Sequence, residues 1–75
     1  MKFIELSGKS LRTLLKGDEL SPEELDSAGV ADDTIVRINQ QGDIEVRRQD
    51  RWDVIGGLLG DFKQRLKQVT HLDWA

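Results

Sequence analysis

Few residues in this chain combine the type and spacing that catalysis requires. His71 is the single histidine, and the sequence contains no cysteine. A thiolate zinc site, a thiol nucleophile and a structural disulfide are therefore excluded together. A Ser-His-Asp arrangement would depend on His71 within a chain of 75 residues, which is too small to offer a deep pocket. We therefore expect His71 to be solvated, and the protein to be non-enzymatic, with no metal or cofactor.

Two glycine-containing segments could instead bind phosphate or another anion. Residues 7–10 read Ser-Gly-Lys-Ser, the ending of a phosphate-binding loop, but that motif needs a glycine at position 3, where Phe3 stands. We interpret this segment as a helix N-terminus. The glycines of residues 56–60 precede a helical pattern and could aim backbone amides at an anion. A sharp strand-to-helix turn with close packing is the favoured explanation of these glycines, and an anion site here ranks below the interaction hypotheses given below.

Charge and hydropathy set further bounds. The net charge is −3, and residues 1–33 carry four Lys/Arg against eight Asp/Glu, whereas residues 34–75 carry seven against six. An acidic chain disfavours a dedicated nucleic-acid binder, because phosphate neutralisation requires a clearly positive face. No stretch approaches the roughly 20 apolar residues that cross a bilayer, and the first residues lack the apolar segment of a signal peptide. We expect a soluble, cytoplasmic protein with no membrane contact.

The first half of the chain predicts one strand and two short helices. Residues 2–6 are rich in strand formers. Leucines at positions 11, 14 and 15 then have the spacing of one helical face, with Ser7 or Ser10 as the N-cap and Gly17 as the stop.

The second helix, over residues 22–28, is marked at both ends. Ser21 and Glu24 have the spacing of a capping box, and Gly29 suits the left-handed position that ends a helix. The carboxylate pair Glu23–Glu24 is thereby explained by capping, and the pair Asp32–Asp33 by a turn. Neither pair suggests a catalytic dyad.

A hairpin with a defined register follows. A three-residue loop over residues 40–42, with Gly42 at positive φ, keeps one face of both strands apolar. The pairs on that face are then Val36 with Val46 and Ile38 with Ile44. The same register places Arg37 opposite Glu45 on the wet face, which is a favourable cross-strand pair.

The next turn is less constrained, because it contains no glycine. A loop over residues 49–51 would pair Val46 with Val54 and Arg48 with Trp52, and would again preserve the apolar face. We predict a third strand over residues 51–55, which bends at Gly56–Gly57 into a helix over residues 58–70.

A single helix from about residue 52 is the alternative, because the apolar residues from there on repeat at spacings of three and four. Two glycines inside such a helix would cost about 1 kcal/mol each relative to alanine. With either start, we expect the same side chains to face the core: Leu58, Leu59, Phe62, Leu66 and Val69. The fold class is thus α+β in one domain, residues 1–75: an N-terminal strand, two short helices, a three-stranded antiparallel meander, and a C-terminal amphipathic helix packed on one sheet face.

Function must then reside in the surface. Arginine and tryptophan, the residue types that anchor interfaces, gather around the second turn of the meander, and a further tryptophan lies near position 75. The candidate interaction surface is Arg47, Arg48, Arg51, Trp52 and Trp74. Trp52 could instead be a core residue, since burying an aromatic ring is valuable in a small domain. The sequence favours a protein-interaction module or accessory subunit that binds a protein partner or forms a homodimer.

The alternative is an antitoxin-like regulator that binds nucleic acid through a basic hairpin and one face of the last helix. Its candidate contacts are Arg37, Arg47, Lys63, Arg65 and Lys67. The acidic residues Glu45, Asp50 and Asp53 interrupt that basic face and disfavour this alternative.

Overall fold

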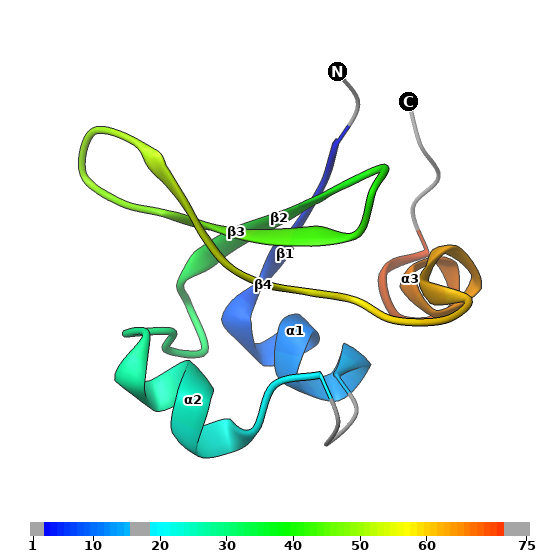
Figure 1. The fold of residues 1–75 in the computed structure, drawn as a ribbon, viewed down its shortest axis with the longest axis horizontal. Helices are drawn as coiled ribbons and strands as arrows, with labels where there is room; N and C mark the ends of the chain where they lie inside the picture. The colour runs from blue at the N-terminus through cyan, green and yellow to red at the C-terminus, as the bar shows by residue number, and fades with distance from the viewer. Residues whose placement is uncertain (1–2, 16–18, 72–75) are drawn as a thin grey trace.

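The computed structural model describes residues 3–15 and 19–71. Its elements in chain order are β1 (Phe3–Ser7), α1 (Gly8–Leu14), α2 (Pro22–Ser27), β2 (Ile35–Asn39), β3 (Asp43–Arg47), β4 (Trp52–Gly57) and α3 (Phe62–Thr70). The four strands form one antiparallel sheet in the order β1-β2-β3-β4 (Figure 1). Helices α1 and α2 lie together on one side of the strands, and α3 lies beside them and contacts α1. The predicted α+β fold class is confirmed.

Helix α1 begins within the phosphate-loop-like segment, residues 7–10. The Ser7 hydroxyl accepts a hydrogen bond from the Ser10 amide at 3.2 Å, so Ser7 rather than Ser10 is the N-cap. Gly8 is buried against the backbone of the loop that follows α2. The segment is therefore a strand-to-helix junction, and the stop predicted at Gly17 lies outside the described residues.

Helix α2 has the predicted caps at both ends. The side chains of Ser21 and Glu24 each accept the other's backbone amide at 3.2 Å, which completes the capping box. Gly29 has a φ of 77°, and its amide donates to the Asp26 carbonyl while the Val30 amide donates to that of Leu25. These two bonds make a Schellman motif.

The β2–β3 register is also as predicted. Val36 pairs with Val46, Arg37 with Glu45, and Ile38 with Ile44. Gly42 has a φ of 89°. The buried Asn39 side chain accepts hydrogen bonds from the Gln41 and Asp43 amides, so it fixes the turn from within.

The predicted β3–β4 register is wrong by one residue. Trp52 pairs with Arg47 and not with Arg48, and Val54 pairs with Glu45 and not with Val46. The Arg48 amide donates to the Arg51 carbonyl at 2.8 Å, which closes a tighter turn than the predicted three-residue loop. Because side chains alternate along a strand, this slip moves Trp52 and Val54 to the other face of the sheet.

A β-bulge next to Val54 restores the apolar face farther along the strand. The register between β3 and β4 shifts between Ile44 and Glu45, so the extra residue Ile55 turns back toward the core. A bulge inserts one residue into one strand only, which is why the alternation in the sequence did not reveal it.

The strand alternative for residues 51–57 is confirmed, but the last helix starts at Phe62 instead of residue 58. Leu58 is buried as predicted, and its amide donates to the Gly42 carbonyl at 2.8 Å. Leu59 is 56% exposed, so its predicted place in the core is wrong. Its backbone amide instead donates to the Glu19 carboxylate at 2.6 Å, in a segment that Gly60 turns with a φ of 67°.

The core lies between the inner face of the sheet and the three helices. Phe62 and Val69 of α3 are partly buried and pack against it, as expected. Its buried apolar members are Ile4, Leu6, Leu11, Leu14, Leu20, Leu25, Val30, Val36, Ile38, Ile44, Val46, Leu58 and Leu66. Strands β1, β2 and β3 each contribute one side of their alternation to this cluster, and β4 adds the partly buried Ile55. The opposite sides of the strands form a second, outer sheet face.

Candidate functional site

The outer face of the sheet is the first candidate surface. The strand registers place on it the side chains that alternate with the core residues. We call this set the outer face: Phe3, Glu5, Ile35, Arg37, Glu45, Arg47, Trp52 and Val54. Among the elements that the structure describes, all three helices contribute their buried residues to the core on the opposite side.

Arg37 lies at the centre of the outer face. Its Nε and Nη2 donate to the two carboxylate oxygens of Glu45, at 3.2 and 3.3 Å. Its guanidinium carbon lies 3.8 Å from the centre of the Phe3 ring and 4.1 Å from that of Trp52. A guanidinium over an aromatic face contributes roughly 0.5–1 kcal/mol at exposed sites. The Arg37 side chain thus links β2 to residues of all three other strands.

Around this centre, the outer face mixes apolar surface with charges of both signs. Ile35 and Val54 are 53% and 59% exposed, which makes them two of the exposed large hydrophobic residues in the described part of the chain. The exposed Arg47 lies with its guanidinium carbon 5.6 Å from the Trp52 ring. Glu5 pairs across the strands with Arg37. The face therefore offers apolar contact area beside both cations and carboxylates.

The structure brings together only part of the interaction surface predicted from the sequence. Arg47 and Trp52 are neighbours on the outer face, and Trp52 is partly buried there, outside the core. Arg51 is exposed in the turn between β3 and β4. Arg48 points the other way: it donates to the Ala28 carbonyl at 2.8 Å. Trp74 lies outside the described residues.

Arg48 consequently has a structural role within the fold. Its guanidinium also contacts the Asp53 carboxylate at 3.3 Å, so it ties the C-terminal end of α2 to β4. The sequence contained no sign of this contact, because Ala28 and Arg48 lie 20 residues apart.

The predicted nucleic-acid contacts are dispersed. Arg37 already pairs with Glu45. Arg65 is not on the solvated side of α3, because it forms an ion pair at 2.6 Å with Glu19, whose side chain has 0% exposure. Lys63 and Lys67 are exposed on α3.

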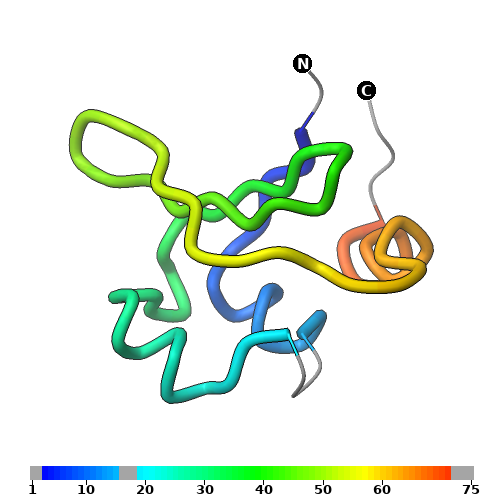
Figure 2. Tube along the Cα trace, viewed as in Figure 1, coloured from blue at the N-terminus to red at the C-terminus, as the bar shows by residue number. Residues whose placement is uncertain are grey.

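Helix α3 and the β3–β4 turn lie at opposite sides of the molecule (Figure 2). The cations of the helix and those of the hairpin turn therefore do not form one continuous basic surface.

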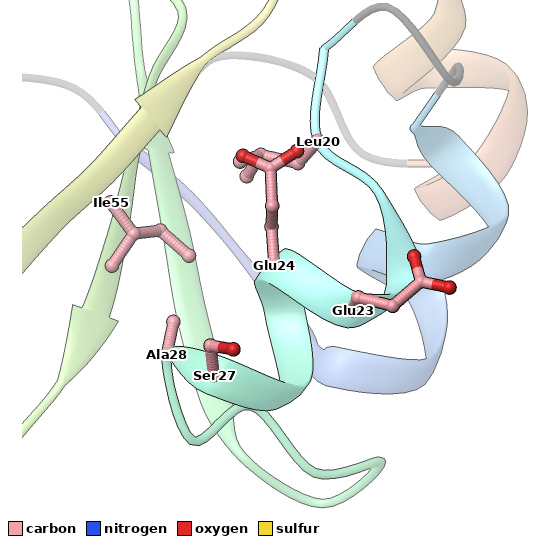
Figure 3. A pocket seen from close by; sticks show the side chains of 6 residues that line it. All are labelled: Leu20, Glu23, Glu24, Ser27, Ala28 and Ile55. Atoms are coloured by element: carbon pink, nitrogen blue, oxygen red, sulfur yellow. The ribbon is translucent and has the colours of Figure 1, made fainter.

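A groove between α2 and β4 is the second candidate surface. It has a volume of about 450 Å³, is open to solvent, and is lined by Leu20, Glu23, Glu24, Ser27, Ala28 and Ile55. Figure 3 shows the Ile55 side chain extending from β4 toward α2, with the Glu24 carboxylate beside Leu20. The sequence did not point to this groove, because it explained both carboxylates by helix capping.

His71, the first residue considered for chemistry, lies at the end of α3. His71 is exposed and caps α3 with a left-handed φ of 59°, in agreement with its expected solvation. Residues 3–15 and 19–71 contain no group of three or more His, Asp or Glu placed to hold a metal ion. Over the same residues, no helix has the length and apolar character that a membrane span needs.

Comparison with known proteins adds nothing to this geometry: no family model, no curated protein and no solved structure matches the chain.

Proposed function

We propose that this chain is a small non-enzymatic protein-interaction module that binds through the outer face of its sheet, as a homodimer or as an accessory subunit. The observation that carries the proposal is the pair of exposed aliphatic side chains, Ile35 and Val54, which flank the stack of Arg37 on Trp52. Aromatic residues and arginine are enriched in interfaces, and exposed apolar area is the part that gains from being covered.

Self-association is supported by the charges on the outer face. A two-fold interface brings the same surface of both subunits together, so it must complement itself. Glu5, Arg37 and Glu45 stand side by side across β1, β2 and β3. Because carboxylates and a guanidinium alternate along this row, a copy rotated by a two-fold axis and offset by one position can place the Arg37 of each subunit near a carboxylate of the other.

The test is the oligomeric state of the purified chain, measured by light scattering over a dilution series. We expect a dimer that Ile35→Glu and Val54→Glu each shift toward monomer, because each would bury a carboxylate. Leu59→Glu is the matched control, since Leu59 is equally exposed but lies outside the outer face. The proposal would be contradicted if the wild-type chain were monomeric and if it captured the same host proteins as the Val54→Glu variant does.

Nucleic-acid binding has less support. Arg37 and Arg65 are paired with carboxylates inside the fold. A gel-shift titration across salt decides between the two functions, because phosphate contacts weaken steeply as salt rises. Salt-dependent binding that Arg47→Ala reduces would favour the regulator over the interaction module.

A further inference from the structure

The groove between α2 and β4 reaches the strand at Ile55, between two contacts that attach α2 to β4. At one end Arg48 joins the carbonyl of Ala28, the C-cap of α2, to Asp53 of β4. At the other end Leu20, just before α2, packs so closely on Gly56 that a Cβ there would lie 3.1 Å from its side chain. The helix is thus attached near both ends of the strand, and the open space between these attachments borders β4.

Strand β4 is also an edge of the sheet, and its free hydrogen-bonding groups can be assigned. It pairs with β3 alone, and residues alternate between hydrogen-bonded and non-hydrogen-bonded pairs in an antiparallel ladder. Since Arg48 and Arg51 are hydrogen-bonded to each other, the next pair that contains Trp52 is not, nor is the pair that contains Val54. Trp52 and Val54 therefore direct their N–H and C=O groups toward the open edge. Among the described residues, none outside the sheet bonds to these groups.

The lining of the groove indicates the chemistry of an occupant. Leu20, Ala28 and Ile55 supply an apolar floor, and Glu23 and Glu24 supply the rim. Within residues 3–15 and 19–71, no Lys or Arg forms an ion pair with either glutamate. A lysine or arginine fits such a place, because its aliphatic stem can cover apolar surface while its charge reaches a carboxylate.

We propose that this groove is a docking site for an extended, basic segment of a partner protein, which adds to the sheet as a strand beside β4. The main chain of the segment hydrogen-bonds to Trp52 and Val54, as in other cases of strand addition. Alternate side chains, the cationic ones, then enter the groove, where their aliphatic stems cover Ile55 and their charged ends meet Glu23 and Glu24.

A second copy of the chain fits this edge less well. Its own β4 strand reads Trp-Asp-Val-Ile-Gly-Gly, which carries a carboxylate and no cation to meet the acidic rim. The site is also separate from the outer face, since Ile55 turns toward the core side while Val54 faces outward.

The experiment is an NMR titration of the full chain with the synthetic peptide Val-Lys-Val-Lys-Val-Lys, capped at both ends. A Val-Glu alternating peptide and a Lys-only peptide are the controls. We expect saturable binding of the first peptide, weaker binding of Lys-only peptide and none of the Val-Glu peptide. The perturbed amides should be those of β4 and α2, and hydrogen exchange of the Trp52 and Val54 amides should slow.

The variants separate charge from folding. Glu24→Gln removes the charge but keeps the side-chain oxygen that accepts a hydrogen bond from the Ser21 amide. Glu23→Gln removes the other carboxylate charge of the rim. Each should weaken peptide binding by about threefold, as expected for an exposed ion pair. Ser27→Arg should weaken it further, because it places a cation of the chain itself at the groove. Ile35→Glu should leave peptide binding unchanged and alter only self-association.

Four outcomes would overturn the inference. The first is no saturable binding, and the second is binding that both Gln variants leave unchanged. The third is equal binding of the Val-Glu peptide. The fourth is protection of the Trp52 and Val54 amides in a dimer of the free chain, which would show that a second copy occupies the β4 edge.

Discussion

Arg37 stabilises the outer face through contacts of two kinds. It makes a two-point ion pair with Glu45, and its guanidinium carbon lies over the rings of both Phe3 and Trp52. The side chains of Arg37 and Glu45 are only 21% and 12% exposed, so water and salt weaken this pair less than a fully exposed one. The residue is therefore structural as well as part of the proposed interface.

Replacing Arg37 with Ala should lower the free energy of unfolding by about 1–2 kcal/mol, the sum expected for the ring contacts and the ion pair. Arg37→Lys should recover only part of this loss, because an ammonium lacks the planar guanidinium that stacks on aromatic rings and matches a carboxylate with two parallel hydrogen bonds. Urea unfolding measures both variants. Arg51→Ala, an exposed turn residue, is the control and should change stability little. Equal stability of the Lys variant and wild type would show that the stack adds nothing.

Gly8 shows why the phosphate-loop-like segment needs its glycine. A Cβ at Gly8 would lie 1.9 Å from the carbonyl oxygen of Ala31, a backbone atom that cannot rotate away. The Gly8 amide also donates to the Thr34 carbonyl at 2.8 Å, and the Lys9 amide to that of Asp32. The glycine therefore permits the loop after α2 to pack against the β1–α1 junction.

Gly8→Ala should consequently destabilise the fold by about 3 kcal/mol, as overpacking a close backbone contact does. Thermal and urea unfolding of the variant, beside the exposed control Lys9→Ala, test this expectation. A Gly8→Ala protein within about 0.5 kcal/mol of wild type would mean that the loop yields without cost.

At the scale of elements, the sequence predicted the parts that local chemistry determines. Helix α2 has its signals in Ser21, Glu24 and Gly29, and the β2–β3 register follows from Gly42 and two aliphatic pairs. The β3–β4 turn has no glycine, so its length was open. The prediction paired Val46 with Val54 in order to keep one sheet face apolar. In the structure the bulge brings the Ile55 side chain to that face, so the pairing of the two valines is not needed.

The start of α3 could not be predicted for a related reason. Leu59 continues the helical spacing of the apolar residues, but the helix does not include it because its amide binds Glu19, 40 residues earlier in the chain. Likewise, the nearness of Arg47 and Trp52 followed from their adjacent positions at a turn. The place of Phe3 beside them depends on the β1–β2 pairing, for which the sequence has no local signal.

The C-terminal cap of α2 gives the test at this scale. Gly29→Ala should lower the free energy of unfolding by about 1–2 kcal/mol, because a Cβ makes the left-handed conformation that Gly29 adopts unfavourable. Steric conflict contributes little, since the nearest atom to the added Cβ, on Arg48, would be 3.6 Å away. Gly29→Asn should cost less, because asparagine tolerates this conformation. Urea unfolding that shows the same loss for both would assign the effect to the Arg48 side chain instead.

At the scale of the whole molecule, the ion pair of Glu19 with Arg65 connects three distant segments. Arg65 donates to both Glu19 carboxylate oxygens, to the Leu14 carbonyl at the end of α1, and to the Leu59 carbonyl before α3. The Leu59 amide completes the cluster by donating to Glu19. Helix α3 is thus held against α1 by polar contacts as well as by Leu66, which is fully buried.

Replacing either Glu19 or Arg65 with alanine should lower the free energy of unfolding, but by different amounts. Arg65→Ala leaves the Glu19 carboxylate, with 0% side-chain exposure, without this cation, and should cost about 3–5 kcal/mol. Glu19→Ala should cost less, because Arg65 is 18% exposed and keeps the carbonyls of Leu14 and Leu59. Urea unfolding of both variants tests this order. The reverse order would mean that the carboxylate reaches solvent once Arg65 is gone.

The double variant Glu19→Leu with Arg65→Met separates the cost of an unpaired charge from the need for this particular link. Apolar replacements of similar volume often restore the stability that an unpaired buried ion removes. We therefore expect the double variant to be more stable than Arg65→Ala, with α3 still docked on α1, as judged by nuclear Overhauser contacts between the helices. If the double variant is as unstable as Arg65→Ala, the hydrogen bonds to Leu14 and Leu59 hold α3 in place, and burial of charge is secondary.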